Sequence, residues 1–457
     1  MLNFIHNVDR YHNFKRMHFF SKINFSKINF FSIAFAFIPL SFIAGNMIIN
    51  INIILIILSG LVLYNKKLLT IDYYLIDKLI ILFFILVIGT GLINDIFVLN
   101  KLSWGTKFAT TVRSFLFLKY LLLYIVLRYL VENQFIKLKF FFISCALASI
   151  FVCFDIFYQF INGEDIFGFK ATPEFRKLSG PFGDELIAGS FIQRFSIFSF
   201  FILPLYYAKQ FKSYFKYLIP ILFLIFFAGI ILSGNRMPTL LFLFCVSLII
   251  IFQKQTRKYF FPFIFFFLII FFTVFSFNAK VKSNFKNFYG QISMIIAYIS
   301  EDKTSNNKQP QFYVKEFSSF YETWRLNKYI GGGIKSFRYY CHVRDNIDKN
   351  VKPVCNMHPH NYYLEILTET GLIGFIISIS FFIITLYLSF YKKYFSVTHI
   401  SNNNYIIPFI FLFITEIFPI KSTGSFFTTG NSTYFFILLA VLIGIARREN
   451  KYDKSRI

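Results

Sequence analysis

Long apolar runs recur along the chain and constrain its fold more than any other feature of the sequence. A helix needs roughly 20 apolar residues to cross a bilayer, and about twelve runs approach that length. We therefore predict an all-α, polytopic integral membrane protein, not a soluble globule with one core. The expected limits of the spans are 30–45, 47–64, 75–94, 110–131, 140–161, 187–207, 216–233, 238–252, 259–277, 363–390, 405–420 and 430–446.

The composition agrees with a membrane protein. Of the 457 residues, 56% are hydrophobic and only 15% are charged, whereas a soluble domain is about 25% charged. The net charge of +25 raises the alternative of a nucleic-acid partner. Lysine and arginine, however, cluster in short loops between the apolar runs, as membrane topology requires. We therefore expect membrane lipids as a partner and no nucleic acid.

The basic short loops also predict the orientation of the chain. They alternate regularly and fall on one side with the amino terminus and the carboxyl-terminal tail, which we assign to the cytoplasm. The predicted organisation is a cytoplasmic segment 1–29, spans one to nine within 30–277, a large periplasmic loop 278–362, spans ten to twelve within 363–446, and a cytoplasmic tail 447–457.

The large loop is the one connection long enough for a small subdomain. Residues 312–330 have an aromatic stripe at helical spacing, and the three glycines 331–333 are expected to end that helix. Cys341 and Cys355 lie further along. An oxidising compartment favours a disulfide between them; two free thiols remain an alternative. A metal site that adds His342 and His358 fits no usual zinc spacing, so we expect no metal.

Several cations are expected at the external face. Arginine suits phosphate groups because its planar fork donates two parallel charge-assisted hydrogen bonds. The alternative is that each arginine anchors a helix at lipid headgroups or, near the sixth span, pairs with Asp184 and Glu185. Lys335 and Arg338 follow the glycines, and the candidates for binding a diphosphate are Arg176, Arg194, Arg236 and Arg325.

The stretch "HPHNYYLEILTETGLIGF" (358–375) lies where the loop meets the tenth span. Pro359 predicts a helix start directly after it, which places His360 in the first turn, on one face with Leu364, Leu367 and Gly371. An imidazole at that boundary can accept a proton near neutral pH. The alternative is an interfacial capping role, and His358 is interpreted as a bystander.

Two further features follow from the same stretch. Glu365 and Glu369 are expected on a second face of the helix. Gly371 and Gly374 are expected to let a neighbouring helix approach closely.

This stretch resembles the histidine signature of the O-antigen ligase and O-antigen polymerase superfamily. Three other segments agree in order: "GPFGDELIAGSFI" (180–192), "LSGNRMPTL" (232–240) and "YETWRLNKYIGGGIKSF" (321–337). The resemblance implies a GT-C-like membrane glycosyltransferase of the bacterial inner membrane. Such an enzyme takes its glycan from undecaprenyl diphosphate at the periplasmic face, without a cofactor.

The resemblance also implies residue roles. His360 matches the family histidine that activates the acceptor hydroxyl, and Arg325 and Arg236 match family arginines. Either Arg194 or Arg176 matches the arginine near the Gly-Phe segment. The residues that would orient the histidine are Asn361, Glu365 and Glu369.

Three functions stay open at this point. A ligase passes the glycan to lipid A–core, and a polymerase passes it to another lipid-linked repeat. A polysaccharide or lipid transporter belongs to a different class and would show related halves with broken helices. The sequence contains no evident internal repeat, which argues against the transporter. It does not decide between ligase and polymerase, and we take the ligase as the first hypothesis.

Overall fold

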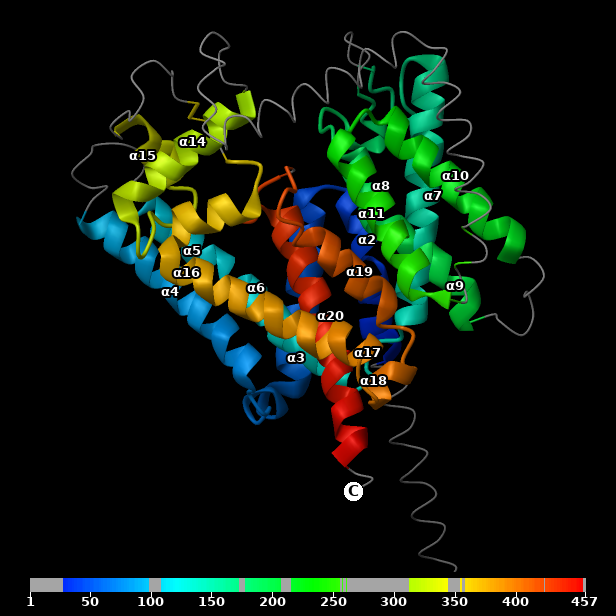
Figure 1. Ribbon diagram of the computed structural model, residues 1–457, viewed down its shortest axis with the longest axis horizontal. Helices are drawn as coiled ribbons and strands as arrows, with labels where there is room; N and C mark the ends of the chain where they lie inside the picture. Colours follow the sequence, from blue (N-terminus) through cyan, green and yellow to red (C-terminus); the bar gives the residue numbers. More distant parts are fainter. Residues whose placement is uncertain are drawn as a thin grey trace, which may run out of the picture.

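The computed structural model describes residues 28–97, 108–171, 177–206, 215–254, 257, 260, 312–343, 354–355, 358–422 and 424–454. These residues form α-helices joined by short turns, and no β-strand occurs among them. Figure 1 shows the resulting bundle of helices. The predicted all-α class is therefore confirmed for the described part of the chain.

The first half of the bundle is built from helices that follow the predicted runs. Their bounds are α2 (Ile38–Ile43), α3 (Asn46–Leu69), α4 (Leu75–Phe97), α5 (Ala109–Phe117), α6 (Lys119–Glu132), α7 (Leu138–Asn162), the 3-10 turn η2 (Gly180–Phe182), α8 (Ala188–Phe195), η3 (Ser196–Phe198), α9 (Ser199–Tyr206), α10 (Phe215–Leu232) and α11 (Arg236–Phe252).

The second half contains the loop helices and the last spans. Their bounds are α14 (Phe312–Trp324), the 3-10 turn η5 (Arg325–Asn327), α15 (Phe337–Val343), α16 (Tyr362–Leu386), the π-helical turn η6 (Tyr387–Tyr391), α17 (Lys392–Tyr394), α18 (His399–Asn402), α19 (Ile407–Glu416) and α20 (Thr429–Lys454).

Seven helical stretches of the described chain are long and apolar enough to cross a membrane. Four shorter apolar helices, 28–43, 217–232, 236–252 and 407–416, accompany them. Together they overlap every predicted span except 259–277, which lies outside the described residues apart from Phe260. These apolar helices indicate a membrane protein. Seven of the predicted spans form helices that are long enough to cross a membrane. The seven are 46–68, 75–97, 109–132, 138–162, 188–206, 362–394 and 429–451.

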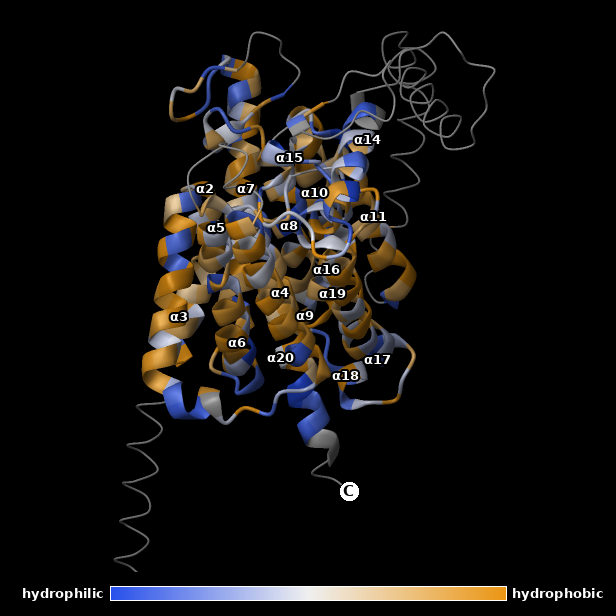
Figure 2. Ribbon diagram, turned by 90° about the vertical axis from the view of Figure 1, so that its left-hand side faces the viewer, coloured by the Kyte–Doolittle hydropathy of each residue, from blue (hydrophilic) through white to orange (hydrophobic). Residues whose placement is uncertain are grey.

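α20 forms the centre of the bundle. Its side chains from Tyr434 to Ala446 are almost all buried, and it packs most extensively on α6. α3, in contrast, exposes apolar side chains such as Met47 and Val62. Figure 2 shows α3 at the edge of the bundle, with most of its ribbon in the colours of hydrophobic residues. Apolar side chains on an outer helix surface suit contact with lipid.

The loop helices lie at one end of the bundle. α14 and α15 sit there beside the first turns of α16, whereas α17, α18 and the carboxyl-terminal end of α20 lie at the opposite end (Figures 1 and 2). The predicted loop helix is present as α14 and η5, and the glycines end it as expected. The loop subdomain is thereby set against the start of α16.

α20 continues without a break through the predicted boundary at 446 to Lys454. Ion pairs hold this extension to its neighbours. Arg447 pairs with Asp77 of α4 at 3.1 Å, and Arg128 of α6 pairs with the same carboxylate at 2.5 Å. The carboxyl-terminal end of α20 is therefore part of the packed bundle.

Candidate active site

The histidine stretch enters α16 through an asparagine cap. The Asn361 side-chain oxygen accepts hydrogen bonds from the backbone N–H groups of Tyr363 (3.0 Å) and Leu364 (3.1 Å). A side chain of this kind satisfies N–H groups that the first helical turn leaves unpaired. The Asn361 amide also donates to the Pro419 carbonyl oxygen at 2.8 Å. Asn361 therefore connects the start of α16 to the loop after α19.

The predicted place of His360 in the first helical turn is wrong. α16 begins at Tyr362, and His360 has a left-handed φ of 51° outside the helix. Asn361 is the cap, so the residue before it is free of helical geometry, and His360 does not share a helix face with Leu364. Few residues other than glycine adopt a positive φ. The surrounding contacts must hold His360 in this conformation.

The two histidine rings lie together. Their centroids are 4.4 Å apart, and both side chains are half-buried. Burial, with the electrostatic effect of the neighbouring His360 ring and the positive charges of Lys335 and Arg338, lowers the pKa of His358 to about 4. His358 is therefore a neutral imidazole near neutral pH. The sequence interpretation as a bystander missed this neighbourhood, which the spacing of two histidines around one proline could have indicated.

Glu365 and Glu369, the candidates for orienting His360, bond to other groups. The Glu365 carboxylate accepts hydrogen bonds from the Ser425 hydroxyl and the Phe426 backbone N–H, both at 2.5 Å. The Glu369 carboxylate faces the backbone N–H of Lys335, and its Oε2 atom has no hydrogen-bond partner among the described residues. Each carboxylate is about 1% exposed. They attach the loop before α20 and the glycine-rich turn to the start of α16.

Gly371 breaks α16, and the glycine-rich turn fills the break. Gly371 has a φ of 66°. The backbone N–H of Leu372 donates to the Lys328 carbonyl oxygen at 2.9 Å, and that of Ile373 donates to the Tyr329 carbonyl oxygen at 3.1 Å. A Cβ atom on Gly371 would overlap the Tyr329 carbonyl oxygen. The requirement for glycine here is close approach of a loop, not of a helix as the sequence suggested.

The same contact is reinforced from the loop side. Gly332 N–H donates to the Thr368 carbonyl oxygen at 3.1 Å and Gly333 N–H donates to the Glu369 carbonyl oxygen at 2.8 Å. Gly374 does face a helix, since a Cβ there would lie 3.1 Å from Leu86 of α4. The turn 328–333 and the α16 break thus form one unit, which we call the glycine clasp.

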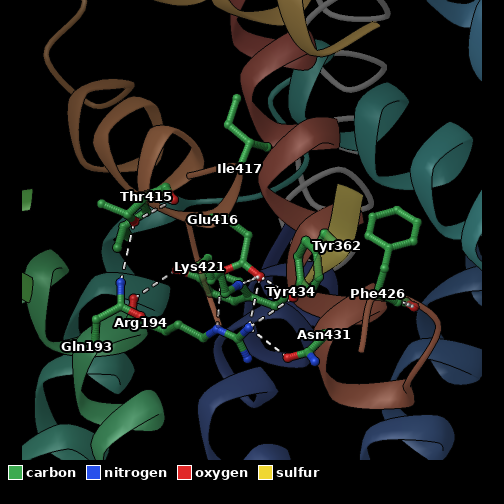
Figure 3. A network of polar contacts seen from close by, with 12 residues as sticks. Gln193, Arg194, Tyr362, Thr415, Glu416, Ile417, Lys421, Phe426, Asn431 and Tyr434 are labelled. Carbon is green, nitrogen blue, oxygen red and sulfur yellow. Dashed lines mark hydrogen bonds and ion pairs between the residues drawn. The ribbon is translucent and has the colours of Figure 1, made fainter. Parts of the chain in front are cut away.

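A buried ion cluster lies beside the first turn of α16 (Figure 3). Glu416, at the end of α19, accepts hydrogen bonds from Arg194 (2.8 Å), Lys421 (2.6 Å) and the Tyr362 hydroxyl (2.6 Å). Arg194 also donates to the Asn431 side-chain oxygen at 2.7 Å. The cluster therefore joins α8, α16, α19 and α20 at one point.

Within this cluster Arg194 pairs with Glu416, not with Asp184 or Glu185. Lys421 was not singled out from the sequence, although a lysine next to a predicted span is a recognisable signal. Burial lowers the pKa of Lys421 to about 7, against the opposing effect of Glu416. Two cations thus share one buried carboxylate.

The three described arginines among the four candidates have different surroundings. Arg236 is the exposed first residue of α11, and Arg325 is exposed on η5. Arg194 is buried in the ion cluster. Arg176 lies outside the described residues. Among the described residues, the lysine and arginine whose charges act on His358 are Lys335 and Arg338.

A disulfide anchors the chain ahead of the histidines. Cys341 of α15 is bonded to Cys355, with Cα atoms 5.6 Å apart. Phe320 stacks on Phe337 with ring centroids 3.4 Å apart, and Leu364 packs against this small core. Within the described ranges no group of three or more His, Cys, Asp or Glu side chains is arranged to hold a metal. The disulfide thus ties α15 to the segment that leads into α16, and Leu364 of α16 packs on the same small core.

These features lie in a segment with a known family match. Residues 221–379 match the family model of O-antigen ligase. The resemblance predicted from the sequence is confirmed over these residues, which include the disulfide, the glycine clasp and both histidines. A search of curated proteins finds no match to the chain. The O-antigen ligase match supports a membrane enzyme of ligase or polymerase type that acts on lipid-linked glycans.

Proposed function

We propose that the protein is an O-antigen ligase-like inverting glycosyltransferase. It moves a glycan from undecaprenyl diphosphate to lipid A–core at the periplasmic face of the bacterial inner membrane. The observation that carries this proposal is the histidine pair at the start of α16. His360 lies there beside His358, with two cations nearby, inside the segment that matches O-antigen ligase.

The chemistry proposed for this site is a single displacement. The acceptor hydroxyl oxygen attacks the anomeric carbon while His360 takes the hydroxyl proton. The bond between the anomeric carbon and the diphosphate oxygen breaks, and the diphosphate leaves with the electron pair. Cations stabilise the charge that develops on it. Arg325 and Arg236, with Arg194 or Arg176, are the arginines that the family resemblance proposes for this role.

Glu365 and Glu369 support the site and do not act as a glycosidase-like acid pair. Both carboxylates are buried and bonded to the fold. Neither is placed to flank a glycosidic bond, which a pair of catalytic carboxylates has to do. We propose that they orient the histidine stretch indirectly, through the loops that they hold.

The proposed orientation places the loop 278–362 in the periplasm and both chain ends in the cytoplasm. The position of α14 and α15 opposite the end of α20 supports it. A short tag inserted at Asn306 tests the orientation, since an impermeant reagent should label it from the periplasm. Labelling only after the inner membrane is opened would overturn the proposed sides.

Glycolipid analysis of a deletion strain tests the function. A ligase predicts that full-length glycan accumulates on undecaprenyl diphosphate, with none on lipid A–core. A single repeat unit attached to core would show instead that the protein is a repeat-unit polymerase. A normal glycolipid profile would remove both functions.

A further inference from the structure

Lys335 and Arg338 are two cations whose charges act on His358 at the start of α16. Both side chains are half-buried. No ion pair joins either of them to a residue in the described part of the chain. Their positive charges nevertheless act on His358 and on Glu369. Two clustered, unpaired cations in a partly buried position favour an anionic ligand.

The fold holds the backbone of Lys335 in an energetically unfavourable conformation. Its φ is 59°, in the left-handed region, which few residues with a Cβ adopt. The Lys335 backbone N–H faces the Glu369 carboxylate, and the Glu369 carbonyl oxygen accepts a hydrogen bond from Gly333 N–H at 2.8 Å. Both contacts come from α16. The glycine clasp therefore fixes this lysine relative to the histidine stretch.

Arg338 is fixed from the other side. It lies on α15, between Phe337, which stacks on Phe320, and Cys341 of the disulfide. Its Nε atom is buried and has no hydrogen-bond partner. An unpaired buried donor is unfavourable, and an anion oxygen would satisfy it. The arginine is thus held in place with its Nε donor unpaired.

The other candidate cations differ from this pair. Arg194 donates three hydrogen bonds to Glu416 and Asn431 inside the bundle. The side chains of Arg236 and Arg325 are exposed at the protein surface. Lys335 and Arg338 are the described cations that are both partly buried and close to the histidines.

We propose that Lys335 and Arg338 bind the diphosphate of the lipid-linked donor. The proposal rests on the proposed function, because it takes the anion beside His360 to be the leaving group of the transfer. Lysine supplies a compact charge and arginine a planar fork, a combination suited to the several oxygens of a diphosphate. The acceptor's phosphates and bulk anionic headgroups share this chemistry, so the test has to separate these sources.

Binding of undecaprenyl diphosphate to the full-length protein in phosphatidylcholine nanodiscs is the test. Lys335→Gln and Arg338→Gln each should raise the Kd about tenfold, and the double variant about a hundredfold, as expected for charged hydrogen bonds. Lys335→Arg should keep the Kd within about twofold, because it preserves the charge. Lys328→Gln, which removes an exposed lysine of the same loop, should leave the Kd unchanged.

Two results of the binding assay would overturn the inference. One is a Kd of the double variant within about twofold of wild type. The other is a rise in the Kd of the double variant for undecaprenyl diphosphate that appears only when phosphatidylglycerol is added to the nanodiscs. This result assigns Lys335 and Arg338 to bulk anionic headgroups. In a transfer assay, the KM for the donor should rise and the KM for the acceptor should stay constant. The reverse assigns the pair to acceptor phosphates. The binding assay involves no transfer, so its failure leaves the histidine mechanism standing.

Discussion

Replacing Glu416 with glutamine removes the one carboxylate that Arg194 and Lys421 share. Arg194 is 8% exposed and Lys421 is 3% exposed, so neither can regain water without opening the bundle. Removing one partner of a buried pair costs about 3–5 kcal/mol, because the remaining charge stays buried. We expect Glu416→Gln to lower the free energy of unfolding by at least about 3 kcal/mol, because both Arg194 and Lys421 lose their counterion.

Unfolding of the protein in mixed micelles, titrated with a denaturing detergent, measures this loss. Glu449→Gln is the matched control, because Glu449 pairs with Arg448 near the surface. A partly exposed pair contributes about 0–1 kcal/mol. The double variant Glu416→Gln with Lys421→Met should recover part of the loss, since one unpaired cation is removed. A Glu416→Gln variant within about 1 kcal/mol of wild type would refute the reasoning.

Three further perturbations test other parts of the structure. Gly371→Ala should lower the melting temperature, because its Cβ would overlap the Tyr329 carbonyl oxygen. The control Gly430→Ala should keep the wild-type melting temperature, because its Cβ would meet Phe42 at an ordinary 3.6 Å. Equal melting temperatures of the two variants would exclude the glycine clasp. Burial and neighbouring cations hold the pKa of His358 at about 4, below its ordinary 6.5. Between these two pH values the folded state binds fewer protons than the unfolded state. The free energy of unfolding should therefore fall as the pH drops from 6.5 to 4. His358→Gln should flatten that fall, and an unchanged slope would contradict the assignment. Mass spectrometry without reductant should find Cys341 and Cys355 resistant to alkylation, and ready alkylation would show that they are free thiols.

The helical spans were predictable because length and apolar content suffice to identify them. Pro359 predicts a start of α16 that is too early, because a proline favours a helix start directly after it. The actual signal is Asn361, whose side chain caps the helix and leaves His360 outside it. Helix starts depend on one such side-chain contact, which a sequence pattern indicates only within a few residues.

The buried contacts were much harder to predict. Arg194 and Glu416 are separated by 222 residues, so no local spacing connects them. The three glycines 331–333 predicted a helix end correctly. Their partner, the break at Gly371, requires knowledge that the loop folds back onto α16. Sequence thus indicated which residues were unusual, whereas their partners came from tertiary packing.

The histidine mechanism makes one direct prediction for transfer. Purified His360→Ala protein in nanodiscs should transfer glycan from undecaprenyl diphosphate to acceptor at least about a hundredfold more slowly than wild type, the usual contribution of a general base. Its melting temperature and its Kd for undecaprenyl diphosphate should match wild type. A stably inserted His360→Ala variant that transfers glycan at the wild-type rate would contradict the account.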